Sequence, residues 1–240
     1  MKNILLVGLV LLLVLSGCSG KEVKNEKTAK ELAEEGTVRY EDGNFMGAVE
    51  SFQRLKEWYP FSDLATLAEL KIADAYYHME KYPEASQWYV EFENLHPNNE
   101  AIPYVIYQTG RCSFDELEKI DQDPTFGRKA LNIFSRLIRE YPNDPYALRA
   151  AHHIDECYKR LAGNEFYIGR FYYKEKNYKA ALLRFKNVIS NYPDVGVHGK
   201  ALQYISQCEN KIKLQAEKPE DPEDTSGNTF DSSHVTDTGL

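Results

Sequence analysis

The sequence GNFMGAVESFQRLKEWYP, residues 43–60, contains the pattern from which the fold is predicted. Its apolar residues recur at offsets of 3, 4, 7 and 10 from Phe45, and this spacing places them on one stripe of a helix. Ala48 allows a neighbouring helix to approach closely, Phe52 fills the groove beside it, and Pro60 cannot continue the helix. The stretch therefore predicts an amphipathic helix that ends at a Tyr-Pro pair and packs against another helix.

The same pattern occurs three more times, and its last copy is KNYKAALLRFKNVISNYP, residues 176–193. The intermediate copies end at Pro97 and Pro142. In three of the four copies a small residue stands twelve positions before the helix alanine: Gly36 before Ala48, Ala73 before Ala85, and Gly169 before Ala181. This order of a small residue, an alanine, an aromatic residue and a proline resembles the tetratricopeptide repeat of about 34 residues.

The intervals between the four prolines are 37, 45 and 51 residues. The second interval leaves about eleven residues beyond one repeat, which we place around residues 120–126, where Asp121, Asp123 and Pro124 break the helix. The third interval leaves about seventeen residues beyond one repeat, enough for one further helix, which we place at residues 146–161. With a last helix at about 198–212, we expect an all-α fold of ten helices in five pairs over residues 29–212, a right-handed solenoid with a concave surface. Another helical bundle with the same periodicity is the alternative.

The N-terminus has the features of an export signal. Lys2 precedes a twelve-residue apolar run, residues 4–15, which is shorter than the roughly 20 residues that a membrane-spanning helix needs. The following Leu15-Ser16-Gly17-Cys18 resembles the lipobox of bacterial lipoproteins, which implies that Cys18 is acylated (palmitate among its chains) and becomes the mature N-terminus. We therefore predict a signal peptide at 1–17 and a lipidated tether at 18–28. Ser19, in place of Asp, implies the periplasmic face of the outer membrane; ordinary secretion is the alternative.

Charge separates the C-terminus from the rest of the chain. Residues 213–240 contain seven acidic residues against two lysines, and this composition predicts a solvated, disordered acidic tail. The whole chain has 37 acidic and 29 basic side chains, a net charge of −8. This balance argues against nucleic acid as a partner, because phosphate binding requires a surplus of Lys and Arg.

Nothing in the sequence supports catalysis. The chain contains no phosphate-binding glycine loop and no Gly-x-Ser-x-Gly elbow, so we expect no catalytic residues and no cofactor. The cluster His152, His153, Glu156 and Cys157 lies on two helix faces about 100° apart, which disfavours a shared metal ion. We expect one solvated histidine and one packed against the next helix. We also expect the three cysteines after Cys18 to be buried apolar residues, although one disulfide is left open: Cys112, Cys157 and Cys208.

Five further motifs occur in a fixed order: Tyr59-Pro60-Phe61-Ser62, Ala73-Asp74-Ala75-Tyr76-Tyr77, Tyr104-Val105-x-Tyr107-x-x-Gly110, Asp121-x-Asp123-Pro124 and Tyr141-Pro142-Asn143-x-x-Tyr146. Together with the lipobox and Tyr172-Tyr173, they resemble the BamD family of outer-membrane assembly lipoproteins over residues 28–212. The resemblance implies a non-enzymatic scaffold of the machine that folds and inserts β-barrel proteins. Its C-terminal repeats would dock on the periplasmic domains of the barrel subunit BamA, beside accessory lipoproteins, and its N-terminal repeats would receive unfolded outer-membrane protein substrates. Another periplasmic repeat lipoprotein, pilotin-like or coordinating envelope division, is the rival hypothesis.

The resemblance also suggests site residues. Arg184 and Tyr172 match the region that contacts the barrel subunit, and we expect Arg184 to face outward, free for a partner carboxylate. Its alternative is a solvated arginine that pairs within its own helix. Tyr59 and Phe61 match the region near the substrate. Met46 stands where the family has a basic residue, which leaves the electrostatic part of substrate recognition open.

Overall fold

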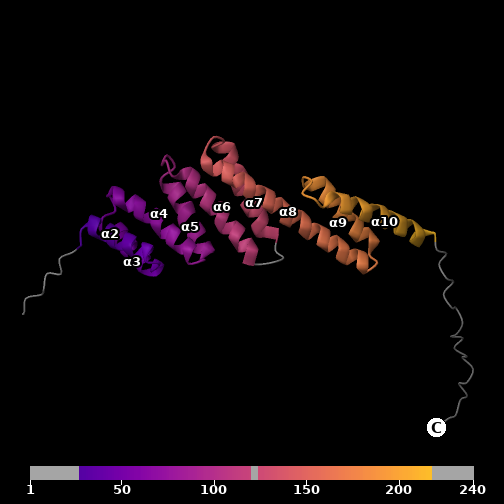
Figure 1. The fold of residues 1–240 in the computed structure, drawn as a ribbon, viewed down its shortest axis with the longest axis horizontal. Coiled ribbons are helices and arrows are strands. Elements are labelled where there is room, and N and C mark those ends of the chain that lie inside the picture. Colours follow the sequence, from indigo (N-terminus) through magenta and orange to yellow (C-terminus); the bar gives the residue numbers. More distant parts are fainter. Residues whose placement is uncertain (1–26, 120–123, 218–240) are drawn as a thin grey trace, which may run out of the picture. The chain divides into compact units, whose positions relative to one another are not determined.

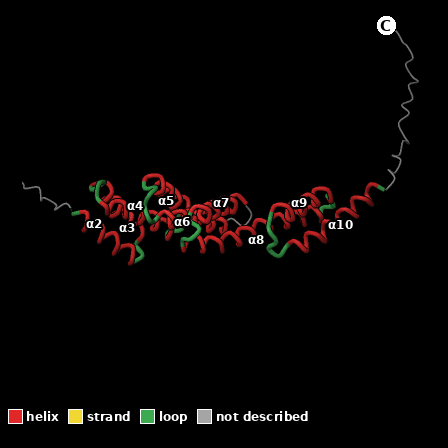
Figure 2. Tube along the Cα trace, turned by 90° about the horizontal axis from the view of Figure 1, so that it is seen from above, coloured by secondary structure: helices red, strands yellow, loops and turns green. Residues whose placement is uncertain are grey.

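The computed structural model describes residues 27–119 and 124–217, and all regular structure in these two ranges is helical (Figures 1 and 2). No helix within them is long and apolar enough to cross a membrane. The helices are α2 (Ala29–Glu41), α3 (Phe45–Trp58), α4 (Asp63–His78), α5 (Tyr82–Leu95), α6 (Ile102–Lys119), α7 (Pro124–Glu140), α8 (Pro145–Lys174), α9 (Tyr178–Asn191) and α10 (His198–Ala216). The signal peptide, Cys18, Asp121, Asp123 and residues 218–240 lie outside the described residues.

The chain divides at Glu116 into two compact units. In the N-terminal unit each helix packs on the next, α2 on α3, α3 on α4 and α4 on α5. Gly36 of α2 and Phe52 of α3 form the contact that the repeat pattern predicts: a Cβ added to Gly36 would lie 2.6 Å from the Phe52 ring. The small residue therefore makes room for the buried aromatic, and the tetratricopeptide type of helix pairing is confirmed.

Local sequence sets the boundaries of these helices. Thr28 and Glu31 form a reciprocal capping box that starts α2, and this arrangement satisfies two backbone donors at the helix N-terminus. Gly43 has a φ of +76° in the turn to α3, a conformation that glycine adopts without a steric penalty. Asn44 then caps α3 by accepting a hydrogen bond from the Gly47 backbone. The short turns therefore follow from residues next to the repeat pattern.

A buried carboxylate joins three helices of the N-terminal unit. Asp74 of α4 is buried, and its Oδ1 accepts hydrogen bonds from the hydroxyls of Tyr89 on α5 (2.8 Å) and Tyr104 on α6 (2.6 Å). Lys71 lies 3.5 Å from the other carboxylate oxygen. A buried charge is tolerated when donors of this kind satisfy it, so this network fixes the relative register of α4, α5 and α6.

The C-terminal unit repeats the same packing. Helix α7 packs on α8, α8 on α9 and α9 on α10. Gly169 of α8 faces Phe185 of α9 as Gly36 faces Phe52, with an added Cβ 2.8 Å from the ring. His153 stacks on Phe134 of α7, with ring centroids 5.1 Å apart, whereas His152 is exposed. One histidine is thus packed and one solvated as expected, but the packed one lies against the preceding helix.

The structure corrects the expected number of helices. The extra helix at 146–161 and the first helix of the following repeat are one continuous helix, the 30-residue α8. No proline interrupts the chain between Pro145 and Pro193, and a mid-helix glycine such as Gly163 costs only about 1 kcal/mol. The two described ranges therefore contain nine helices. The all-α tetratricopeptide-repeat fold is confirmed, whereas its right-handed course and its concave surface over residues 29–212 stay predictions.

The last helix also extends further than expected. It begins at His198, as the pattern indicates, but continues to Ala216, so residues 213–216 are helical and the expected start of the tail at Lys213 is wrong. The three cysteines of the described residues are free and buried, which confirms their interpretation as buried apolar residues.

Candidate protein-interaction sites

The turn between α3 and α4 presents Phe61. Helix α3 ends where the Tyr59 backbone N–H bonds to the Leu55 carbonyl, and Pro60 cannot continue a helix. Ser62 then caps α4 by accepting a hydrogen bond from the Leu64 backbone. Between these two anchors the Phe61 side chain is 100% exposed. A fully exposed aromatic on a turn that is held at both ends is suited to contact another polypeptide.

Tyr59, the other residue expected at the substrate, lies differently. Its ring is half-buried and packs against the core of the N-terminal unit. Its hydroxyl donates a hydrogen bond to the Lys27 carbonyl at 2.9 Å. Tyr59 therefore ties the start of the described chain to α3, whereas Phe61 is fully available.

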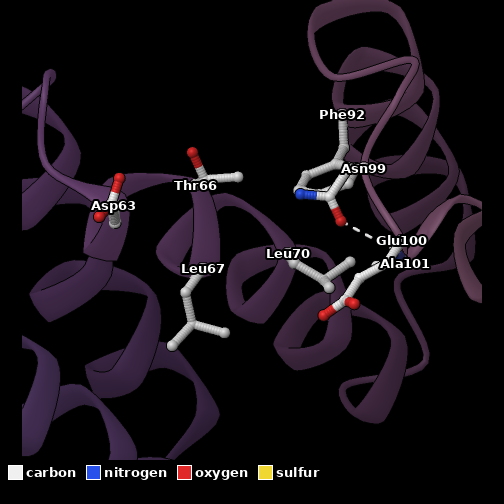
Figure 3. Close-up of a pocket in the computed structure, with 8 residues that line it drawn as sticks. All are labelled: Asp63, Thr66, Leu67, Leu70, Phe92, Asn99, Glu100 and Ala101. Carbon is white, nitrogen blue, oxygen red and sulfur yellow. Dashed lines mark hydrogen bonds between the residues drawn. The ribbon is translucent and has the colours of Figure 1, made fainter.

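A pocket lies at the start of α4, two residues beyond Phe61 in the chain (Figure 3). Its volume is about 360 Å³. Side chains from the first two turns of α4 line one side, and Phe92 of α5 and the loop to α6 line the other: Asp63, Thr66, Leu67, Leu70, Phe92, Asn99, Glu100 and Ala101. The loop is held by a hydrogen bond from the Ala101 backbone to the Asn99 side chain, 2.9 Å long. The pocket is thus built on ordered elements.

The lining of this pocket suits a particular chemistry. Leu67, Leu70 and Phe92 provide an apolar surface, which favours an apolar side chain of a bound segment. Asp63 and Glu100 place two carboxylates in the lining, and these favour a positive charge nearby and disfavour a negative one.

In the C-terminal unit, Arg184 of α9 is paired with Glu165 of α8. The arginine Nη1 lies 3.3 Å and 3.1 Å from the two carboxylate oxygens. Glu165 is buried, with 9% of its surface exposed, whereas the Arg184 side chain is 38% exposed. The expectation of an arginine free for a partner carboxylate is therefore wrong, and so is pairing within its own helix. The partner is on the neighbouring helix because α8 and α9 pack face to face.

Tyr172 lies on the same side of α8 as Glu165, seven residues further along, since seven residues are close to two helical turns. Its ring is half-buried against the core of the C-terminal unit and makes an edge contact with Phe171, with centroids 5.7 Å apart. Arg184 and Tyr172 therefore both belong to the α8–α9 packing and are only partly accessible to another protein.

Charge is distributed unevenly between the two described ranges. Residues 27–119 contain nine Lys and Arg against eighteen Asp and Glu, a net charge of −9. Residues 124–217 contain sixteen against nine, a net charge of +7. The acidic N-terminal unit therefore favours a basic partner, and the basic C-terminal unit favours an acidic partner. The overall charge of −8 conceals this difference, and counting charges by half would have found it.

Other residues of these sites carried no signal in the sequence. The pocket is formed where α4 meets the α5–α6 loop, about thirty residues away, and single-sequence patterns do not show such a meeting. Glu165 is separated from Arg184 by nineteen residues. The one available hint was that consecutive helices of a repeat pack together, which would place some residue of α8 opposite Arg184.

Comparison with known proteins places these features in a family context. Residues 25–223 match the model of the YfiO family, described as outer membrane lipoprotein. The chain is 30% identical over 207 residues to the outer membrane protein assembly factor BamD of Caulobacter vibrioides, covering 84% of this chain and 68% of the relative. It is 33% identical over 186 residues to the protein of the same name from Rickettsia prowazekii, covering 77% and 74%.

Among solved structures, the kinesin light chain TPR-like repeats of Podosopora anserina align with 79% of this chain and 96% of that chain, with 11% identity and a TM-score of 0.44.

Proposed function

This chain belongs to the YfiO family of outer membrane lipoproteins, and from that membership we propose that it works as an outer-membrane protein assembly factor. In this role it is a lipid-anchored, non-enzymatic scaffold of the β-barrel assembly complex. Its N-terminal unit receives unfolded outer-membrane protein substrates, and its C-terminal unit docks on the periplasmic domains of a BamA-type barrel subunit. The observation that carries the substrate part is the fully exposed Phe61 beside the α4 pocket.

Phe61 and the pocket support binding of an extended segment. A bound segment that covers the exposed Phe61 ring stabilises the complex, because each Å² of apolar surface removed from water contributes about 25 cal/mol. A volume of about 360 Å³ accommodates a large side chain of the bound segment. Tyr59 takes part by holding the chain beside this turn through its bond to Lys27.

Electrostatics restricts which segments fit. The pocket lining includes Asp63 and Glu100, and the surrounding unit has a net charge of −9. A terminal carboxylate in this pocket would meet like charge, whereas Lys or Arg next to an apolar side chain would meet opposite charge. Substrates are therefore bound through internal apolar residues with basic neighbours. By the resemblance, Met46 stands where the family has a basic residue, and the loss of a positive charge there agrees with a preference for basic segments.

Docking of the barrel subunit is assigned to the opposite unit. The net charge of +7 on residues 124–217 favours an acidic partner surface. The Arg184 side chain is 38% exposed although it pairs with Glu165. An arginine that binds one carboxylate still has N–H donors for a second acceptor. Arg184 can therefore bind a carboxylate of a partner as well, while the half-buried Tyr172 stabilises the α8–α9 packing.

The anchor is assigned to Cys18, which together with the family membership supports placement at the periplasmic face of the outer membrane. Replacing Cys18 with Ala should release the folded chain from the membrane fraction, because the acyl chains supply the membrane affinity. Continued sedimentation with outer membranes would mean that partner contacts hold the protein there.

The decisive experiment is affinity purification of the chain from native membranes in mild detergent. An outer-membrane barrel protein with periplasmic domains, recovered in near-equal amount, is the expected result. Recovery of a secretin or of division proteins in its place would contradict the assembly function. An Arg184→Glu variant purified in parallel should recover less of the barrel protein at physiological salt.

A further inference from the structure

The second half of α8 carries an exposed stripe of two aromatic and two basic side chains. Tyr167, Arg170, Phe171 and Lys174 occur at positions i, i+3, i+4 and i+7, which places them on one face of the helix. All four are exposed, Tyr167 by 61% and Phe171 by 54%. The buried residues Glu165 and Gly169 lie on the opposite face. We call these four residues the α8 stripe.

Contacts among the described residues explain little of the composition of the α8 stripe, since its ring contact is the edge contact of Phe171 with the neighbouring Tyr172. Within residues 27–119 and 124–217, neither Arg170 nor Lys174 takes part in an ion pair. Helices α7, α9 and α10 pack around the other sides of the C-terminal unit and leave this face exposed. Two exposed aromatics one helical turn apart are an unusual surface feature when nothing covers them.

The chemistry of the α8 stripe defines its ligand. Arg170 and Lys174 bind carboxylates, the arginine in a bidentate manner. Tyr167 and Phe171 offer ring surfaces on which another aromatic can stack. The ligand is therefore an acidic segment that also contains an aromatic side chain.

Such a segment is present in the chain itself. Residues 218–240 contain six acidic residues against one lysine, and their one aromatic is Phe230, next to Asp231. Their net charge of −5 is opposite to the +7 of residues 124–217. We propose that this acidic tail binds the α8 stripe of the same molecule, with tail carboxylates on Arg170 and Lys174 and Phe230 against Tyr167 and Phe171.

The geometry permits this contact. Tyr204 of α10 lies against Phe166 and Tyr173 of α8, with ring centroids 5.7 Å and 5.1 Å apart, so α10 meets the second half of α8 at this residue. Helix α10 ends at Ala216, about 18 Å beyond Tyr204 at 1.5 Å per residue. Phe230 lies 13 residues beyond Glu217, and 13 residues of unstructured chain have a root-mean-square span of about 20 Å and a full extension of about 43 Å. The tail therefore reaches the stripe without extending fully.

Connection within one chain makes a weak contact sufficient. A short flexible linker gives an effective concentration in the millimolar range, so a segment with millimolar affinity occupies its site for much of the time. The bound tail covers a basic surface of the C-terminal unit and competes with any acidic partner for it. This role concerns the tail alone and is independent of the proposed assembly function.

Zero-length cross-linking of the full chain in detergent tests the proposal. A carbodiimide joins a tail carboxylate to a nearby lysine amine as an amide, with loss of water, and mass spectrometry identifies the pair. We expect cross-links from residues 220–237 to Lys174 at least fivefold more often than to Lys200, an exposed lysine on α10. The double variant Tyr167→Ser, Phe171→Ser should lower the Lys174 yield severalfold, because the ring contacts are lost.

Two outcomes would overturn the proposal. Equal yields at Lys174 and Lys200 would mean that the tail samples the surface without preference. The second outcome comes from a mixture of isotopically heavy and light chains, which distinguishes binding within one molecule from binding between two. If the Lys174 cross-links join heavy to light chains, the stripe binds the tail of a second copy and the proposal is wrong. Circular dichroism of the serine double variant should be unchanged, since both side chains are exposed, and this shows that a lower yield does not reflect unfolding.

Discussion

Arg184 on α9 donates hydrogen bonds from Nη1 to both carboxylate oxygens of Glu165 on α8. The residue that we assign to docking is therefore also a connection between two helices of its own unit. Because Glu165 is buried, losing the arginine leaves a desolvated carboxylate without this partner. A single substitution at Arg184 would consequently change both stability and binding.

A charge swap separates these two effects. Arg184→Glu should lower the free energy of unfolding by about 1–3 kcal/mol, because two carboxylates then face each other at the α8–α9 contact. Adding Glu165→Arg restores opposite charges, so the double variant should regain at least half of that loss. Urea denaturation followed by circular dichroism measures both values.

The same two variants test docking. If Arg184 contacts the barrel subunit, the swapped variant should still recover little of that subunit in co-purification, although it folds stably. Recovery at the wild-type level in the swapped variant would show that Arg184 acts only within its own chain.

Two glycines of α8 should respond to alanine with opposite signs. A Cβ on Gly169 would lie 2.8 Å from the Phe185 ring, whereas a Cβ on Gly163 meets nothing within 4 Å. Gly169→Ala should cost about 1–3 kcal/mol because it overpacks the helix contact. Gly163→Ala should gain about 0.5–1 kcal/mol because alanine is the better helix former. Thermal melts of the two variants provide the comparison, and a stabilised Gly169→Ala would contradict the close contact.

The fold follows from the sequence to the extent that it depends on local pattern. Phe52 and Phe185 are both buried against glycines of the preceding helix, as the repeat offsets predict. The repeat pattern does not predict the continuity of α8, because tetratricopeptide units usually consist of separate helices, whereas here Gly163 and Asn164 are tolerated inside one helix. Repeat lengths alone do not indicate whether two neighbouring helices are joined.

The sites follow from the sequence much less well. Phe61 was identified from a motif, but its full exposure depends on how the turn is capped. The pairing of Arg184 with Glu165 depends on the rotation of one helix against the next, which a difference of one residue in register would change. Side-chain pairing across helices is a tertiary property, and one sequence does not specify it.

Phe61 should matter for binding and not for stability. Phe61→Ala should change the free energy of unfolding by less than about 0.5 kcal/mol, because the side chain is fully exposed. The test ligand is a labelled peptide from an outer-membrane barrel strand that contains an internal aromatic and flanking lysines. Measured by fluorescence anisotropy, the affinity of the Phe61→Ala variant for this peptide should be about three- to tenfold lower than that of the wild type.

Val38→Ala is the matched control for Phe61→Ala, since Val38 is an exposed apolar residue of α2 in the same unit. It should leave the affinity unchanged. An equal loss in both variants would indicate nonspecific hydrophobic adsorption. The same peptide with glutamates in place of the lysines should bind more weakly, because Asp63 and Glu100 line the pocket.

Alkaline pH should destabilise the N-terminal unit. Burial, and then the negative charge of Asp74, raise the pKa of Tyr40 to about 12 from its ordinary value of 10.0. The unfolded chain therefore loses this proton first as pH rises, so stability is fully present below pH 10 and decreases between pH 10 and 12. The loss should be about 1–2 kcal/mol, since the ring is only half-buried. Denaturation at pH 9 and pH 11.5 measures it.

Tyr40→Phe tests the assignment of this pH dependence. The variant should retain part of the decrease, because burial and Asp74 also raise the pKa values of Tyr89 and Tyr104. Its slope between pH 10 and 12 should nevertheless be smaller than that of the wild type. An identical slope would mean that Tyr40 ionises equally well in the folded and unfolded chains.

The three buried thiols should be unreactive until the chain unfolds. Burial raises the pKa of the Cys157 thiol to about 12, and the thiolate is the reactive form. A chain that begins at Ser19, and so lacks Cys18, should show almost no reaction with Ellman's reagent at pH 8 within minutes, then three thiols in guanidinium chloride. Ser190→Cys, at an exposed position of α9, should add one thiol that reacts at once. Rapid labelling of the native wild-type chain would contradict the burial, and only one thiol after unfolding would reveal a disulfide between two of Cys112, Cys157 and Cys208.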